Sequence, residues 1–223
     1  MKILQVSDIH GSSRSAVMIG SKAKDVGADI VLVVGDITNF GSVEGAEKIL
    51  STIVELAHVP ILFVPGNCDP PQLLSYSPRS QNLVNIHAKK IQISGYTFVG
   101  VGGSKTTPHR GTWIEFSEEE LGEILAGLVG GDGLIDWVFV SHNPPIGVEV
   151  SMAGSGVDLG STSIRRFIES YKPIVVCCGH VHEARGISYL GETPVVNAGP
   201  AKEGYCTLIE LHERHAHVYL DTL

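Results

Sequence analysis

The sequence predicts an α/β fold, and two observations support this prediction. Five short runs rich in Val and Ile, bounded by Gly or Pro, have the length and composition of buried strands. Between the first three runs lie two stretches with apolar residues three or four positions apart, the spacing of a helix with one buried face. This order is typical of a parallel sheet with right-handed helical crossovers. The five runs are residues 2–7, 30–34, 61–65, 137–141 and 174–178.

Helices and further strands are expected between and after these runs. The helices are expected at residues 15–26, 42–57, 117–128 and 162–171. The third begins with a capping-box pattern, in which Glu120 follows Ser117 by three positions. The fourth places Ile164, Phe167, Ile168 and Tyr171 on one face. Strands are also expected at residues 96–101, 187–190, 194–198, 205–211 and 215–220.

Each of the five runs is followed by side chains of the types that bind metals. In open α/β sheets, the loops at the carboxyl ends of the strands converge on one edge, where a rigid frame positions functional groups. These side chains are therefore expected to meet in one cleft. The seven candidate metal ligands are Asp8, His10, Asp36, Asn67, His142, His180 and His182.

Seven ligands indicate two metal ions, because a structural zinc takes four protein ligands and a catalytic zinc about three. Two ions that share Asp36 as a bridging carboxylate would use all seven and leave a position between them for hydroxide. The mixture of imidazole, carboxylate and amide suits Mn, Fe, Co, Ni or Zn better than Mg or Ca. The centre would keep a charge of about +1, which attracts a phosphate, and would lower the pKa of bound water to roughly 7. The sequence therefore predicts hydrolysis of a phosphate ester.

Five motifs, taken in order, resemble those of the calcineurin-like metallophosphoesterases, in particular their small prokaryotic type. The motifs are Asp8-Ile-His10, Gly35-Asp36 with Asn39, Gly66-Asn67, His142 and Gly179-His180-Val-His182, and Asn197-Ala-Gly199 is similar to the closing segment of the family. The resemblance implies a four-layer α-β-β-α sandwich, with two mixed sheets flanked by helices, and a single domain over residues 1–223. It also implies that one metal binds to Asp8, His10, Asp36 and His182, and the other to Asp36, Asn67, His142 and His180.

The resemblance further implies a phosphodiesterase that uses a metal-bridging hydroxide as its nucleophile. Asp36, Asn67 and His142 would be catalytic through their hold on the metals and the hydroxide. Many family members have His after Gly-Asn, whereas this sequence has Cys68 followed by Asp69. A thiol forms no cation near pH 7, so it protonates a leaving group poorly. Cys68 and Asp69 remain catalytic candidates, although Cys68 is most simply a small space-filling residue.

Two loops are expected to face the substrate. Residues 102–111 form a polar and basic segment in which His109 and Arg110 are candidate substrate-binding residues. His109 is also a candidate for the missing proton donor, although a histidine in an exposed loop is usually only solvated. Residues 143–160 carry Pro144-Pro145 and little periodicity, which is typical of a long rim or lid.

Composition limits the partners and the location. The net charge of −8 and the pI near 5.6 argue against an extended nucleic-acid surface, which requires a basic stripe. No apolar run reaches the length of about 18 residues that a membrane span needs, and the first residues lack the apolar core of a signal peptide. A small phosphate-ester substrate and a cytoplasmic location are expected, and a homo-oligomer stays open. The cysteines, Cys68, Cys177, Cys178 and Cys206, are expected to be reduced.

Three alternatives to a phosphodiesterase stay open. A phosphomonoesterase, such as a nucleotidase or a phosphoprotein phosphatase, would use the same two metals. A catalytically silent metal-binding scaffold for protein partners would be expected to have lost ligands, whereas all seven are present here. A structural metal domain without turnover is disfavoured by the open position that seven ligands leave between two ions.

Overall fold

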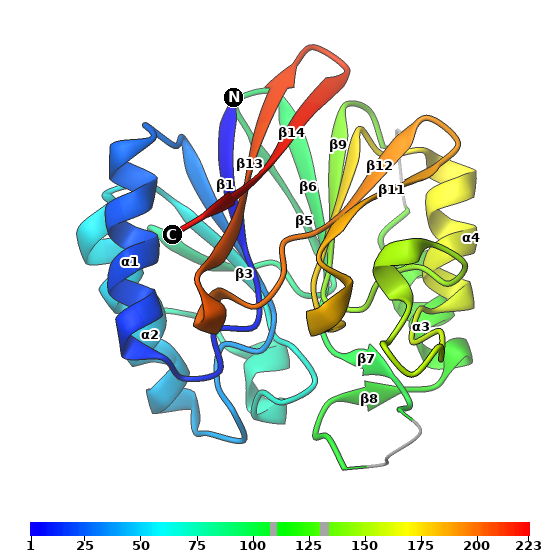
Figure 1. The fold of residues 1–223 in the computed structure, drawn as a ribbon, viewed down its shortest axis with the longest axis horizontal. Coiled ribbons are helices and arrows are strands. Elements are labelled where there is room, and N and C mark those ends of the chain that lie inside the picture. The colour runs from blue at the N-terminus through cyan, green and yellow to red at the C-terminus, as the bar shows by residue number, and fades with distance from the viewer. Residues whose placement is uncertain (108–110, 130–133) are drawn as a thin grey trace.

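Two six-stranded sheets lie between two pairs of helices in the computed structural model, which describes residues 1–107, 111–129 and 134–223. Helices α1 and α2 cover the outer face of one sheet, and α3 and α4 cover the outer face of the other (Figure 1). The prediction of a four-layer α-β-β-α sandwich with two mixed sheets is therefore confirmed.

The first sheet has the strand order β14-β13-β1-β2-β3-β4. Strands β1 to β4 are parallel, and β13 and β14 extend the sheet in antiparallel pairing. The strand bounds are β1 Lys2–Val6, β2 Ile30–Val34, β3 Ile61–Val64, β4 Leu83–Asn85, β13 Tyr205–His212 and β14 His215–Thr222.

The second sheet has the order β11-β12-β10-β9-β6-β5, with four parallel strands in its centre and an antiparallel strand at each edge. Its strands are β5 Lys89–Ile93, β6 Tyr96–Val101, β9 Trp137–Ser141, β10 Val175–Cys178, β11 Gly186–Leu190 and β12 Thr193–Asn197. A short parallel pair, β7 Ser104–Lys105 and β8 Glu115–Phe116, lies beside this sheet at its lower edge (Figure 1). Strands β4, β5, β7 and β8 were not predicted, because β4, β7 and β8 are short and β5 is polar on its exposed face.

Each α-helix begins after a serine whose side chain accepts a hydrogen bond from the first turn, the preferred arrangement of an N-cap. The helices are α1 Ser13–Asp25, α2 Val43–Ala57, α3 Glu118–Gly127 and α4 Thr162–Tyr171. The capping box of Ser117 and Glu120 forms as predicted. Tyr171 ends α4 with 41% of its surface exposed, and its ring contacts the ring of Phe167, as expected for two residues on one face.

Short 3-10 helices complete the chain between these elements. They are η1 Pro71–Ser75, η2 Glu149–Ser151, η3 His182–Ala184 and η4 Ala201–Glu203. Among the described residues, the helices are too short or too polar for any of them to cross a membrane.

Alternate residues of the central strands enter different cores, as the two-residue period of a strand requires. In β2, Leu32 faces the core between the two sheets, whereas Val31 and Val33 face helices α1 and α2. In β10, Cys177 faces the core between the sheets and Cys178 faces helices α3 and α4. The two neighbouring thiols therefore point away from each other and are free.

One buried polar side chain ties the sheets together close to their shared edge. Gln5 of β1 is fully buried, and its Nε2 donates to the carbonyls of Cys178 and Val196 at 3.0 and 3.1 Å. Both carbonyls belong to the opposite sheet. This contact sets how the end of β1 lies relative to the ends of β10 and β12, and the candidate site is built from those ends.

Candidate metal centre

All seven candidate ligands lie at the carboxyl ends of parallel strands, and both sheets contribute. Four follow β1, β2 and β3 of the first sheet, and three follow β9 and β10 of the second. The structure brings the seven side chains together at the seam between the sheets, and three overlapping triads drawn from them and Cys68 have ligand atoms within 4.8 Å of one another. The members of these triads are Asp8, His10 and His182; His10, Asp36 and Cys68; and Asp8, Asp36 and His142.

One half of the centre is formed by the loops after β1 and β10. The Nε2 atoms of His10 and His182 are 3.1 Å apart. Asp8 Oδ1 lies 3.2 Å from Nε2 of His182 and 3.9 Å from Nε2 of His10. One carboxylate oxygen and two imidazole nitrogens therefore face a common point.

The other half is formed by the loops after β3, β9 and β10. Asn67 Oδ1 lies 2.9 Å from Nε2 of His142 and 2.8 Å from Nδ1 of His180. Asp36 stands between the two halves, because its Oδ1 is 3.6 Å from Nε2 of His142 and its Oδ2 is 3.8 Å from Nε2 of His10. A single carboxylate thus presents one oxygen to each half.

The hydrogen bonds of His142 show what kind of ligand this arrangement fits. Its Nδ1 is 2.9 Å from the carbonyl oxygen of Val34, which can only accept, so Nδ1 carries the hydrogen. In the neutral ring Nε2 then has a free lone pair, and it faces the oxygens of Asn67 and Asp36, which also carry lone pairs. Lone pairs that converge without a hydrogen between them repel one another unless a cation joins them. The donor set therefore fits divalent metal ions, and Nδ1–H bound to a carbonyl is the usual support of a metal-binding histidine.

The pKa shifts at the centre favour the protonation states that bind metals. Burial raises the pKa of Asp8, but the hydrogen bond from His182 and the charges of His142 and His182 outweigh burial and lower that pKa. Burial lowers the pKa of His180 to about 3, with a further contribution from His142, and burial also lowers the pKa of His10. His182 differs, because its hydrogen bond to Asp8 raises its pKa.

Four of the seven residues have left-handed backbone conformations, which are unusual for residues other than glycine. The φ angles are 55° at Asp8, 49° at His10, 48° at Asp36 and 70° at His180. Such conformations cost energy and persist at functional sites where the surroundings hold them in place. Here the loops after β1 and β2 brace each other, because His10 N donates to Asp36 O at 2.8 Å and Asp8 N donates to Gly35 O at 3.1 Å.

Asp69 is fully buried, and both of its oxygens are occupied. Oδ1 accepts from the N–H and the hydroxyl of Thr38 at 2.7 and 2.8 Å, and Oδ2 accepts from the N–H groups of Gly66 and Ile37 at 2.8 and 3.1 Å. Burial, followed by the charge of Asp36, raises its pKa to about 6. This geometry shows that Asp69 joins the loop of Asp36 to the loop of Asn67, and the catalytic role considered from the sequence stays a prediction.

Cys68 lies at the edge of the centre and is partly buried. Burial raises the pKa of its thiol, and the nearby carboxylate of Asp36 raises it further, so the thiol stays neutral at pH 7. Its backbone N–H donates to Asp36 Oδ1 at 2.8 Å and so helps to orient that carboxylate. His109 and Arg110 lie outside the residues that the structure describes.

Sequence reasoning missed two features of the site. The glycines of the motifs are required for space, because a Cβ on Gly35 would overlap the imidazole of His142 and one on Gly66 would overlap Asp36. Two lysines also lie within electrostatic reach of the centre. After burial, which is the largest cause, the charge of Lys105 contributes to the lowered pKa of His180, and the charge of Lys202 contributes to that of His10. Lys105 stood in the loop expected to approach phosphate, whereas Lys202 carried no sequence signal.

The family model for calcineurin-like phosphoesterases matches residues 1–184. The chain belongs to this family. It is therefore a metal-dependent phosphoesterase, a hydrolase of phosphoric ester bonds, and its family uses divalent metals. The uncharacterized protein MJ1162 of Methanocaldococcus jannaschii is 37% identical to this phosphoesterase over 205 residues, which cover 90% of this chain and 88% of that protein.

Solved structures with the same fold include enzymes of two kinds. A dimetal phosphatase from Danio rerio has a TM-score of 0.64 and 13% identity, and the match covers 99% of this chain and 98% of that one. An archaeal phosphodiesterase has a TM-score of 0.55 and 14% identity, with 99% of each chain covered. At these identities the likeness concerns the fold.

The space requirement at Gly35 leads to a stability prediction. Gly35 and Gly27 both have positive φ, but a Cβ on Gly27 meets nothing within 4 Å. Gly27→Ala should lower the free energy of unfolding by about 1–2 kcal/mol, the cost of a left-handed alanine. Gly35→Ala should lower it by roughly 1–3 kcal/mol more, because the methyl group overpacks against His142. Urea unfolding of both variants measures this difference, and equal losses would contradict the proposed contact.

Proposed function

We propose that this protein is a dinuclear metal-dependent phosphodiesterase that acts on a small phosphate ester. The observation that carries the proposal is the position of Asp36, whose two oxygens face two separate clusters, one of histidines with a carboxylate and one of histidines with an amide. One metal would be held by Asp8, His10, Asp36 and His182. The other would be held by Asp36, Asn67, His142 and His180. Mn, Fe, Ni and Zn suit this mixture of nitrogen and oxygen ligands.

Divalent ions held there would supply a water acidic enough to act as a nucleophile near pH 7 and positive charge for the phosphoryl oxygens. The residues of this chain supply position and electrostatics. Asn67 and His142 fix one side of the centre, and Asp36 sets the spacing between its two sides. Lys105 and Lys202 add positive charge on the flanks, which favours the approach of an anionic ester.

Two considerations support a diester over a monoester. Cys68 replaces the histidine found in many family members, and a neutral thiol gives little protonation to a departing oxygen. The segment that carries Asn67 and Cys68 also leads into an apolar pocket with room for an ester arm, lined in part by Pro70 and Trp113. A phosphatase and a phosphodiesterase both have this fold, so the fold does not distinguish monoesters from diesters, and the distinction depends on these local features.

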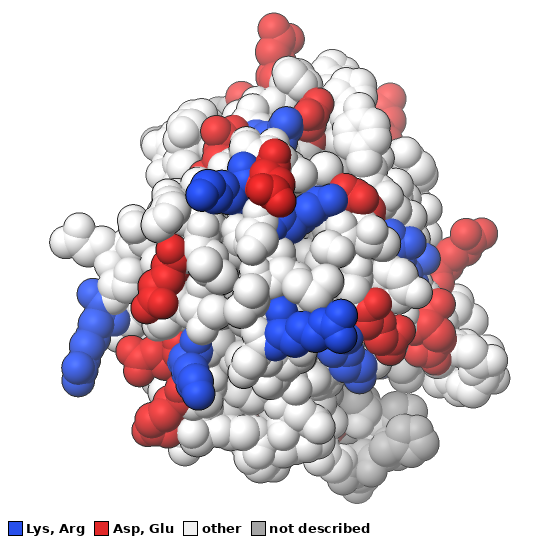
Figure 2. Space-filling model, turned by 60° about the vertical axis from the view of Figure 1, so that its left-hand side comes forward, with Lys and Arg blue, Asp and Glu red and all other residues white. Residues whose placement is uncertain are grey.

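A small substrate fits the charges of the molecule better than an extended nucleic acid does. The chain has a net charge of −8. On the face in Figure 2, Lys and Arg side chains lie among Asp and Glu side chains rather than in one basic stripe. Binding along a nucleic-acid backbone depends on many phosphate contacts with Lys and Arg. Attraction of the substrate would therefore be local to the metals and the two flanking lysines.

Replacement of the bridging carboxylate tests the mechanism. Asp36→Asn keeps one oxygen ligand but removes a charge and the second oxygen, so we expect kcat to fall at least roughly 100-fold and the bound metal to fall below two ions per chain. Metal analysis and turnover of bis-p-nitrophenyl phosphate with saturating Mn²⁺ measure both. Asp29→Asn, an exposed carboxylate that accepts from Lys2 N, is the matched control and should behave as the wild type. Wild-type turnover in Asp36→Asn would rule out the proposed bridge.

A comparison of substrates tests the preference for diesters. We expect kcat/KM for bis-p-nitrophenyl phosphate to exceed that for p-nitrophenyl phosphate by about 10-fold or more, because both share one leaving group but only the diester has an arm to place in the pocket. 2′,3′-Cyclic nucleotides extend the comparison to a natural diester. A higher kcat/KM for the monoester would identify a phosphomonoesterase on the same centre.

The role of Cys68 can be tested by restoring an imidazole. Cys68→His should raise kcat for phenyl esters, which have a poor leaving group, by about 10-fold or more, and change kcat for p-nitrophenyl esters little. Cys68→Ser, which provides no cation, is the matched control. If both replacements affect the two esters equally, leaving-group protonation does not limit the reaction of this protein.

A further inference from the structure

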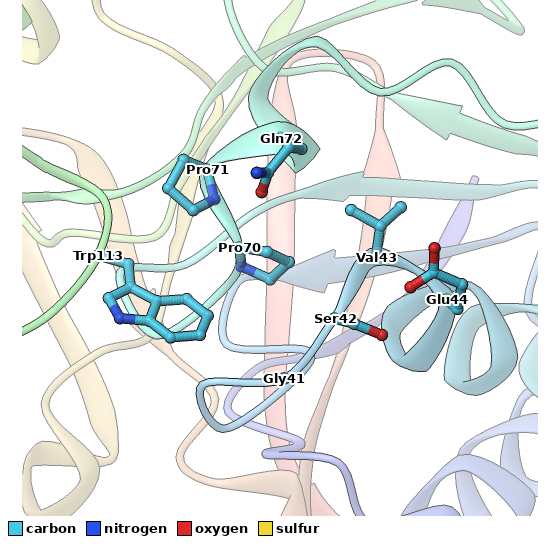
Figure 3. Close-up of a pocket in the computed structure, with 8 residues that line it drawn as sticks. All are labelled: Gly41, Ser42, Val43, Glu44, Pro70, Pro71, Gln72 and Trp113. Carbon is cyan, nitrogen blue, oxygen red and sulfur yellow. The ribbon is translucent and has the colours of Figure 1, made fainter.

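A pocket of about 600 Å³ lies between the start of α2 and the segment that follows Cys68 and Asp69. Its lining residues are Gly41, Ser42, Val43, Glu44, Pro70, Pro71, Gln72 and Trp113. Figure 3 shows Trp113 on one side of the pocket, Val43 and Glu44 on the other, and Pro70 and Pro71 between them, with Gln72 near Pro71. The volume suits a small organic group, because ligand pockets measure roughly 300–1,000 Å³.

Backbone hydrogen bonds connect this pocket to the metal centre. Trp113 N donates to the carbonyl of the candidate ligand Asn67 at 2.8 Å. Phe40 N donates to the carbonyl of Cys68 at 3.0 Å, and its ring meets the Trp113 ring edge to face, with 5.2 Å between the ring centroids. The wall of the pocket at Trp113 and the neighbouring Phe40 are therefore fixed to the segment that carries Asn67 and Cys68.

The two aromatic rings are unusually exposed for their size. Phe40 is 43% exposed and Trp113 is 46% exposed. Phe40 also has a φ of 52°, a left-handed conformation that is a genuine outlier for a bulky residue. Strain of this kind is held at binding sites and ligand clamps more often than elsewhere. Neither ring gains the burial that normally stabilises a large aromatic side chain, and a stacked ligand would supply it.

The polar groups of the pocket narrow the chemistry of that ligand. Gln72 offers an amide donor and acceptor, and Glu44 offers a carboxylate. The negative charge of the Glu44 carboxylate disfavours a second phosphate. This charge is favoured because a hydrogen bond from the Ser42 side chain, as the largest cause, lowers the pKa of Glu44. A planar, uncharged group with hydrogen-bonding edges matches this lining. Bases of nucleic acids have such edges and a π face that stacks on tryptophan.

We propose that this pocket binds the nucleobase of a nucleoside ester whose phosphate lies at the metal centre. The proposal rests on the proposed function for the position of the phosphate. Trp113 is the stacking surface, the two prolines form the apolar wall, and Gln72 contacts the edge of the base. Trp113 is thus a specificity-determining residue, which binds the ester arm and takes no part in the chemistry.

A binding experiment without metal tests the pocket by itself. Trp113 and Trp137 are the tryptophans of the chain, and Trp137 is buried with its Nε1 bound to Tyr171 O. We expect thymidine to quench the tryptophan fluorescence of the metal-free protein in a saturable manner and 2-deoxyribose to leave it unchanged. The saturable quenching should persist in Trp137→Phe and disappear in Trp113→Phe. Absence of saturable quenching by thymidine, or equal quenching by 2-deoxyribose, would overturn the proposal.

Kinetics with the metal-loaded protein test whether Trp113 recognises the base or only forms part of the pocket surface. The two substrates are thymidine 5′-p-nitrophenyl phosphate and methyl p-nitrophenyl phosphate, which share one leaving group. Trp113→Ala should raise KM about 10-fold for the thymidine ester alone, with kcat unchanged and Trp113→Phe restoring most of the loss. Tyr189→Ala removes an exposed aromatic ring of β11 and should change neither substrate. An equal rise in KM for both esters would mean that Trp113 does not recognise the base.

The two experiments also distinguish this proposal from the proposed function. Saturable quenching by thymidine in a protein that hydrolyses no ester would retain the base pocket and reject the phosphodiesterase. Hydrolysis of both esters without quenching would retain the phosphodiesterase and reject the base pocket.

Discussion

The candidate metal centre depends on side chains whose lone pairs are held close to one another. Nε2 of His142, Oδ1 of Asn67 and Oδ1 of Asp36 face a common space, and the hydrogen of the His142 ring is committed to the carbonyl of Val34. Without cations this cluster is repulsive, so the rest of the structure must hold it in place. Preorganisation of this kind lowers the cost of binding metals, because the ligands need not move when ions arrive.

The restraint comes from the backbone and from residues that touch no metal. Asp69 joins the loops after β2 and β3 through four hydrogen bonds, and Gln5 joins the ends of the two sheets. Left-handed conformations at residues such as Asp8 and Asp36 aim their side chains into the seam, while the missing side chains of Gly35 and Gly66 leave room for them. The loops of the centre are thus locally strained, and the buried strands that carry them hold them in place.

Local patterns were sufficient to predict most of the fold and the convergence of the seven candidate ligands. The Val and Ile runs gave the central strands within about one residue, and each motif lay at a strand end, so convergence followed from topology alone. The C-terminal strands β11 to β14 were also predicted closely. The edge strands β4 and β5 were missed, because the pairing of an edge strand depends on neighbours distant in sequence.

The functional details were less accessible for the same reason. Asp69 follows the candidate ligand Asn67 in the sequence, and only the three-dimensional contacts to Thr38 and Gly66 reveal that it joins two loops. The proximity of Lys202 to the centre depends on the return of the chain through β12, and the pairing of Phe40 with Trp113 joins loops that are remote in sequence. The hydrophobic periodicity and the motif spacing of the sequence do not predict such contacts.

The replacement at Cys68 and the pocket beside it have a common physical consequence. With a neutral thiol at this position, the reaction gains little from protonation of the departing oxygen, and transition-state stabilisation must come from elsewhere. Binding energy from a remote part of the substrate can orient the reacting phosphate and compensate for a missing acid. The backbone N–H groups of Trp113 and Phe40 donate to the carbonyls of Asn67 and Cys68, so a ring held there would be fixed relative to the candidate metal ligands. A protein that lacks an acid at position 68 but binds the ester arm at Trp113 would favour esters with a large, flat arm over small alkyl esters.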